Sequence, residues 1–197
     1  MPIPRNWVEE LVLEWLLLRG YIVISNVRLK SGRRGGAKEA DILGLKLLRE
    51  GKKVLEIMHV ETGSVAQNFD ENLKNIRNKF SSERERTLEE ISLDIIELKS
   101  AVNRANISKR YKRIYIASYV SRKQVDRLKE ILKKDNIEFL TLEEVLRKIV
   151  KDIDKWKQNQ ARKGRRTTVG ITLPESWWLL NLIDFIKSRG LMKCVKN

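Results

Sequence analysis

The sequence predicts an α/β fold in which helices cover a single mixed sheet. Segments rich in β-branched residues alternate with segments of helical periodicity, and several of the helices have recognisable capping residues. The 197 residues are enough for one domain with an extension. The expected order is a helix, a three-strand meander, then helix, strand, helix, strand and helix, followed by a C-terminal helical extension.

The N-terminal part is expected to begin with a largely buried helix. Asn6 is a suitable N-cap, Glu9 follows it by three residues as in a capping box, and Gly20 can end the helix. A tight hairpin is indicated around Glu50-Gly51. The β-branched and apolar segments around it predict three strands, at residues 21–29, 40–48 and 52–61.

The rest of the core is expected to alternate helices and strands. Residues 66–105 are charged and helical in pattern, enough for one long helix or two shorter ones. Two further capping-box patterns, Ser121 with Gln124 and Thr141 with Glu144, each open a helix. The strands that alternate with these helices are predicted at residues 111–120 and 136–140.

We divide the chain into a domain at residues 1–154 and an extension at residues 155–197. The segment "KQNQARKGRRTT" in the extension contains no acidic residue, which indicates a linker or a phosphate-binding arm. A short strand in "VGITL" is expected next, followed by a helix capped by Thr172 with Glu175 and ended near Gly190.

The charge balance favours nucleic acid as the partner. Lysine and arginine number 41 against 26 acidic residues, a formal net charge of +15. A thermophilic archaeon is one source consistent with this ion-rich composition, although thermophily does not explain the imbalance. A single cysteine and the lack of a long apolar run predict a cytoplasmic protein without a membrane span.

Two acids in the predicted hairpin suggest a metal site. Paired residue numbers are expected to sum to about 101 or 102, which places Asp41 opposite Val60 or Glu61 at the open end of the hairpin. Glu56 lies roughly 13 Å farther along, so Glu61 is the expected partner and Glu56 a surface or edge-strand charge. The smaller sum would turn Glu61 to the other face, so a shared site needs an odd loop or a bulge. Two carboxylates at a strand end suit Mg²⁺ or Mn²⁺.

The segments "VEELVLEWLLLRGYIVISN", "KEADILGL" and "HVETGS" together resemble the restriction-endonuclease-like PD-(D/E)xK superfamily, most closely its archaeal Holliday junction resolvase and Mrr-like branches. The resemblance covers residues 7–150 in outline. It implies a metal-dependent DNA endonuclease in which Asp41 and Glu61 are catalytic and bind Mg²⁺ or Mn²⁺. Glu9 matches the acid of the family's first helix and would be a third metal ligand.

The lysine of the family motif falls on Gly63 in this chain. Three explanations are open: another lysine has taken its place, metal alone suffices at a lower rate, or the domain binds nucleic acid without cutting it. The candidate replacements are Lys38, Lys74 and Lys79. His59 shares strand parity with Glu61 and is either a substitute ligand or a packed, hydrogen-bonded histidine.

Two basic clusters are the predicted nucleic-acid contacts, unless they are merely solvated faces. One precedes Asp41 and the other lies in the extension: Arg28, Lys30, Arg33, Arg34 and Lys38, then Arg162, Lys163, Arg165 and Arg166. Trp177 and Trp178 indicate that the last helix packs on the core, on a second copy or on another protein. The alternative to an endonuclease is an inactive nucleic-acid-binding or adaptor subunit that keeps the nuclease fold.

Overall fold

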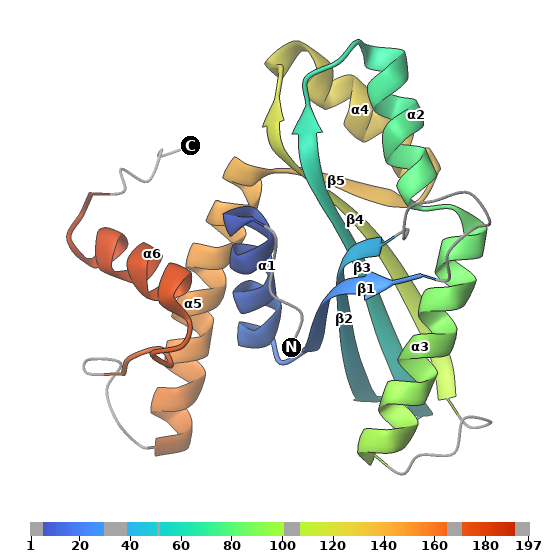
Figure 1. Ribbon diagram of the computed structural model, residues 1–197. Helices are drawn as coiled ribbons and strands as arrows, with labels where there is room; N and C mark the ends of the chain where they lie inside the picture. Colours follow the sequence, from blue (N-terminus) through green and yellow to red (C-terminus); the bar gives the residue numbers. More distant parts are fainter. Residues whose placement is uncertain (1–5, 30–38, 51, 101–106, 165–170, 192–197) are drawn as a thin grey trace.

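The computed structural model describes residues 6–29, 39–50, 52–100, 107–164 and 171–191, which form an α/β fold around one five-stranded mixed sheet (Figure 1). The predicted order of helices and strands is confirmed, and the described part of the expected helical region, residues 66–100, contains two helices. The bounds are α1 Trp7–Leu18, β1 Ile22–Arg28, β2 Glu39–Glu50, β3 Lys52–Val65, α2 Phe69–Lys79, α3 Ser82–Ser100, β4 Ile107–Val120, α4 Arg122–Lys134, β5 Ile137–Thr141, α5 Leu142–Gly164 and α6 Trp178–Ser188.

The five strands follow one another across the sheet in chain order. Strands β1, β2 and β3 are antiparallel neighbours, whereas β4 is parallel to β3 and β5 is parallel to β4. A parallel neighbour requires a long crossover, which α2 with α3 supplies between β3 and β4 and α4 supplies between β4 and β5. The carboxyl ends of β3, β4 and β5 therefore meet at the same edge of the sheet.

Helices cover both faces of the sheet. Figure 1 shows α1, α5 and α6 on one side and α3 on the other. The first side is packed through Leu16, Ile42 and Ile149, while Leu45 and Leu88 pack between the sheet and α3. Helices α2 and α4 close a third cluster over β4 and β5. None of the helices in the described residues is long and apolar enough to cross a membrane.

The ends of α1 follow the predicted signals. The Asn6 side chain accepts hydrogen bonds from the backbone N–H groups of Val8 at 2.9 Å and Glu9 at 3.0 Å, and its amide donates to the Glu9 carboxylate at 2.6 Å. Gly20 has a φ of 79°, a left-handed conformation that glycine adopts without steric cost. The chain can therefore turn sharply into β1.

Helix α5 continues through the predicted boundary at residue 155 and ends at Gly164, so helix replaces the first part of the expected linker. Buried Ile149, Ile153 and Ala161 recur at steps of four and eight residues, and this face holds the helix against the core. Among residues 171–173 no strand forms, and the remainder of the expected strand lies outside the described residues.

Helix α6 begins later than predicted, at Trp178, and neither Thr172 nor Glu175 caps it. Its N-terminus is capped instead by Glu14 of α1. The buried Glu14 carboxylate accepts from the N–H groups of Leu180 at 2.9 Å and Leu179 at 3.3 Å. Burial raises the pKa of Glu14, although these two backbone donors partly oppose the effect. A capping acceptor from a distant helix has thus replaced the local one.

We expect Glu14→Ala to loosen α6, because two buried N–H groups lose their acceptor. The amide protons of Leu179 and Leu180 should exchange much faster in hydrogen–deuterium exchange, and the free energy of unfolding should fall by about 1–3 kcal/mol. Glu175→Ala, at the exposed position that the sequence pattern favours, is the matched control and should change neither quantity. Equal effects of the two substitutions would contradict the cap.

Candidate functional site

The hairpin of β2 and β3 brings Asp41 and Glu61 together. Strand pairs run from Glu50 with Lys52 to Ile42 with Val60, so paired numbers sum to 102. This is the larger of the two expected sums, the one that puts both acids on the same face, and the next pair in this register is Asp41 with Glu61. The Asp41 carboxylate accepts from the backbone N–H of Thr62 at 2.7 Å, which fixes it against β3.

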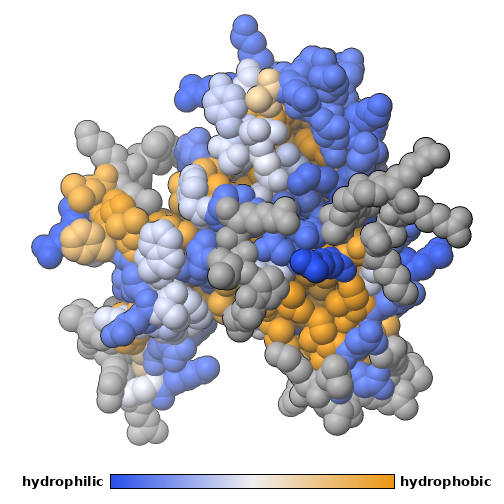
Figure 2. All heavy atoms as spheres, in the orientation of Figure 1, coloured by the Kyte–Doolittle hydropathy of each residue, from blue (hydrophilic) through white to orange (hydrophobic). Residues whose placement is uncertain are grey.

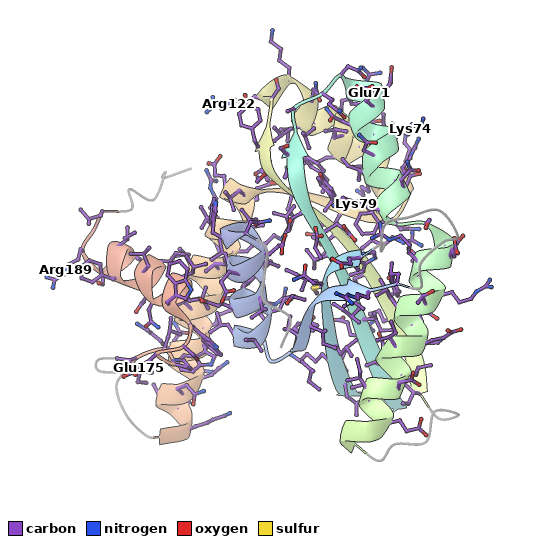
Figure 3. The ribbon with its side chains drawn as sticks, in the orientation of Figure 1. Glu71, Lys74, Lys79, Arg122, Glu175 and Arg189 are labelled. Atoms are coloured by element: carbon purple, nitrogen blue, oxygen red, sulfur yellow. The ribbon has the colours of Figure 1, made fainter. Side chains whose placement is uncertain are left out.

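A lysine on the following helix reaches both acids. The Lys79 ammonium lies 2.9 Å from Glu61 Oε2 and 3.5 Å from Asp41 Oδ2. It also donates to the Thr62 carbonyl at 3.1 Å. Figure 3 shows Lys79 at the end of α2 nearest the strands, whereas Lys74 lies on the outer side of the helix and is exposed. Lys38 lies outside the described residues.

Glu61 has two further partners on its other oxygen. Oε1 is 2.8 Å from His59 Nε2 and 3.3 Å from the Arg84 guanidinium at the start of α3. His59 is fully buried, and its Nδ1 lies 3.1 Å from the Tyr111 hydroxyl. An ionised carboxylate only accepts hydrogen bonds, so Nε2 is the donor to Glu61. The histidine is therefore packed and hydrogen-bonded on both nitrogens.

Only 1% of the Glu61 side chain is exposed. Its carboxyl group is nevertheless ionised, because its pKa is lowered. Burial alone would raise the pKa of Glu61, but the hydrogen bond from His59 and the positive charge of Lys79 outweigh it and lower the pKa. Burial would likewise lower the pKa of Lys79, and the carboxylates of Glu61 and Asp41 reverse that effect. Each partner thus stabilises the charged form of the other.

A neighbouring tyrosine leaves room only for glycine at position 63. A Cβ atom at Gly63 would lie 2.6 Å from the hydroxyl oxygen of Tyr115, which real Cβ contacts essentially never approach. Tyr115 is buried and stacked on Phe139 at 5.9 Å between ring centroids, so it has little room to move. No lysine fits at position 63 while Tyr115 keeps this place, and the ammonium arrives from α2 instead.

The other predicted ligands are not gathered here. Glu9 is buried at the cap of α1, and the described residues contain no group of three acidic, histidine or cysteine side chains spaced to hold a metal. Arg28 is 85% exposed and pairs weakly with Glu39, and Arg162 and Lys163 are exposed at the end of α5. The remaining predicted contacts lie outside the described residues: Lys30, Arg33, Arg34, Lys38, Arg165 and Arg166.

The carboxylate pair has the right chemistry for Mg²⁺ or Mn²⁺, but it does not fit a divalent ion as it lies. Both oxygens of Glu61 and one of Asp41 already accept from donors. The Lys79 ammonium occupies the place between the acids that an ion shared by them would take. A bound metal would have to displace this lysine.

No family model matches the sequence, and no curated protein matches it.

The prediction for Glu56 was wrong, because this residue is buried. It accepts hydrogen bonds from the Tyr21 hydroxyl and from Lys112, the latter at 2.7 Å. Burial would raise the pKa of Glu56, but these two donors outweigh it and lower the pKa. Glu56 therefore joins the N-terminal half of β4 to the segment that follows α1, away from the acidic pair.

Sequence reasoning missed Arg84 and Tyr115, which come from α3 and β4. Neither stands in a motif, and each reaches the site only through the crossover that brings its element beside β3. A partial signal was available for Lys79. It follows buried Asn72 and Ile76 at helical spacing, which places it on the face of α2 that meets the sheet.

We expect Glu61→Gln to lower the free energy of unfolding by about 3–5 kcal/mol, because Lys79 and Arg84 would lose a buried countercharge. Denaturant unfolding measures this. Glu130→Gln is the control, since Glu130 makes a surface pair with Lys134 and should cost less than about 0.5 kcal/mol. A lowered pKa means that Glu61 stabilises the fold above its ordinary pKa of 4.5 and ceases to do so as the pH falls through the folded-state value. The difference between wild type and Glu61→Gln should therefore shrink in acid.

Gly63→Ala should destabilise the protein by about 1–3 kcal/mol through the clash with the Tyr115 hydroxyl. Removing that hydroxyl leaves the ring carbon Cζ, 3.6 Å from the new methyl group, as the nearest atom. The cost of Gly63→Ala should thus largely disappear in a Tyr115→Phe background. A double-mutant cycle of unfolding free energies measures the coupling, and additive effects would refute the packing argument.

Proposed function

We propose that this chain is a nucleic-acid-binding protein of restriction-endonuclease-like fold that does not cut its ligand. The observation that carries the proposal is the single Lys79 ammonium shared by Asp41 and Glu61. With Arg84 beside it, the acidic pair is neutralised by the protein's own cations. A neutralised pair does not repel a phosphodiester, and it has little remaining affinity for a metal ion.

The formal charge of +15 supports nucleic acid, most simply DNA, as the ligand. Figure 2 shows hydrophilic side chains gathered over α2 and α4. Several half-buried basic side chains are already paired with acidic ones: Arg113 with Glu85, and Lys129 with Glu144. Exposed cations are therefore the better candidates for phosphate contacts, and among the described residues they include Arg28, Lys74, Arg122, Lys123, Lys133, Arg162 and Lys163.

A metal-dependent endonuclease is the second candidate, and one observation favours it. Lys79 supplies, from a helix, the lysine that the resembled family carries on its strand. Both Lys79 and Asp41 remain partly exposed, at 33% and 23% of their side chains, so a phosphate can approach them. This function requires Lys79 to give way to Mg²⁺ or Mn²⁺.

We further propose that α6 docks on a protein partner or on a second copy of this chain. Trp177 packs against Trp156 with 6.2 Å between ring centroids, whereas Trp178, Leu182 and Phe185 stay exposed. Apolar side chains gather over α6 in Figure 2. Apolar surface of this kind is typical of docking sites.

Binding and cutting can be separated with labelled linear and branched DNA in Mg²⁺, Mn²⁺ or EDTA. We expect binding that does not need metal, no cleavage, and an affinity that falls by about 10³–10⁵ between 50 and 200 mM salt for six to ten phosphate contacts. Metal-dependent cleavage that Asp41→Ala abolishes would establish the endonuclease instead. Absence of DNA and RNA binding at low salt would sink both candidates.

A thermal shift with Mg²⁺ provides a readout that does not depend on activity. Wild type should show no rise in Tm, because Lys79 fills the place between the acids. Lys79→Ala removes the ammonium from between Glu61 Oε2 and Asp41 Oδ2, so Mg²⁺ should raise the Tm of this variant. The expected stabilisation is about 1.4 kcal/mol at a Mg²⁺ concentration ten times the dissociation constant. Lys74→Ala, on the exposed side of the same helix, should behave like wild type. A rise in the wild type would favour the endonuclease.

A further inference from the structure

A pocket of about 300 Å³ opens at the carboxyl end of β3, next to the acidic pair. In α/β sheets this edge is where ligands bind. None of the described residues that line the pocket carries a charge. Its walls combine apolar groups with neutral hydrogen-bonding groups: Ser64, Val65, Ala66, Gln67, Asn72, Asn75, Ile76 and Tyr115. The lining therefore suits a neutral, flat group with both donors and acceptors.

The Tyr115 hydroxyl is an unused hydrogen-bonding group in this pocket. Tyr115 is only 4% exposed, yet its hydroxyl forms no hydrogen bond with any described residue. The hydroxyl is not sealed off from solvent, because Arg84 Nε is the one fully buried side-chain nitrogen or oxygen of the described residues that lacks a partner. Its open hydrogen-bonding capacity therefore faces the pocket, where a ligand can reach it. Gly63 is what lets the hydroxyl sit here, since any larger residue would collide with it.

The rim of the pocket offers a second set of unused groups. The Asn75 amide donates to Gln67 Oε1 at 2.8 Å, which holds the two side chains together. Among the described residues this leaves the Gln67 amide nitrogen as an open donor and the Asn75 oxygen as an open acceptor. Paired amide groups of this kind are the ones that read the edges of bases. Asn72 is committed to the Gln67 carbonyl and to Gln124 and serves to fix the rim.

The pocket and the charged site share one helix and one tyrosine. Asn72, Asn75, Ile76 and Lys79 follow one another along the face of α2 that meets the sheet. The Lys79 ammonium lies 5.8 Å from the centroid of the Tyr115 ring. A ligand with its neutral part in the pocket would therefore carry an attached anionic group toward Lys79.

We propose that this pocket holds one unpaired nucleobase, with the phosphate of the same nucleotide toward Lys79. This rests on the proposed nucleic-acid binding and adds that single-stranded or locally unpaired nucleic acid is the preferred form. A base within a duplex has its hydrogen-bonding edge paired and cannot enter a pocket of this size. Hydrogen bonds to the edge of the base add to a phosphate affinity that is otherwise independent of the bases.

The test compares three ligands of equal length by fluorescence anisotropy: a single strand, the same strand with its bases removed at several positions, and a duplex. Wild type should bind the intact single strand most tightly. Tyr115→Phe removes only the hydroxyl and should weaken that binding by about two- to tenfold while leaving the abasic strand unaffected. The matched control is Tyr119→Phe, on the same strand of the sheet but 66% exposed, and it should have no effect.

Equal affinity for intact and abasic strands, or a single-strand preference that Tyr115→Phe leaves intact, would overturn the pocket while nucleic-acid binding stands. If no oligonucleotide binds at low salt, the proposed function fails and the pocket is tested by titrating nucleoside monophosphates, observed by NMR. Binding that Tyr115→Phe weakens would then support the pocket alone. No binding would overturn it as well.

Discussion

Glu61 carries a negative charge into a part of the molecule that water hardly reaches, and one face of the sheet is organised around that charge. Burying an unpaired carboxylate costs several kcal/mol, so the fold must bring donors to it. One donor, His59, lies two residues away on the same strand, and the other two come from later helices, Lys79 from α2 and Arg84 from α3. The crossover between β3 and β4 is thereby tied to the strand it leaves. The Glu61 charge is neutralised only when α2 and α3 pack in these positions, because Lys79 and Arg84 come from these helices.

The position of the lysine follows from the same constraint. A lysine on β3 would have to pass Tyr115, whose ring is held by Phe139. A lysine at the last turn of α2 reaches the carboxylates from the helix side without that collision. Helix α2 thus supplies the ammonium group that the two carboxylates need, and β3 does not. With Gly63 on β3, the positive charge beside the acids comes from α2 instead of from the strand.

Much of the fold could be predicted from the sequence, because its signals are local. Strand composition, the Asn6 cap and the left-handed Gly20 each depend on a few neighbouring residues. The pairing of Asp41 with Glu61 was also within reach, since hairpin register is arithmetic once the turn is placed. What failed depended on distant contacts. Glu14 replaced a local cap of α6, and Glu56 was taken for a surface charge although Tyr21 covers it.

The distribution of satisfied and unsatisfied groups argues for where a ligand would bind on this face. At the acids, both oxygens of Glu61 and one of Asp41 already accept hydrogen bonds, so a ligand for these oxygens must displace an existing donor. At Tyr115 and along the Gln67–Asn75 rim, the hydrogen-bonding capacity is open, and a ligand gains without such a loss. Binding a neutral group in the pocket therefore costs fewer existing hydrogen bonds than binding a ligand at the acids. Lys79, 5.8 Å from the Tyr115 ring centroid, can supply positive charge to an anion attached to that group. In the proposed binding mode, the acids hold Lys79 in place and the pocket beside them supplies the recognition.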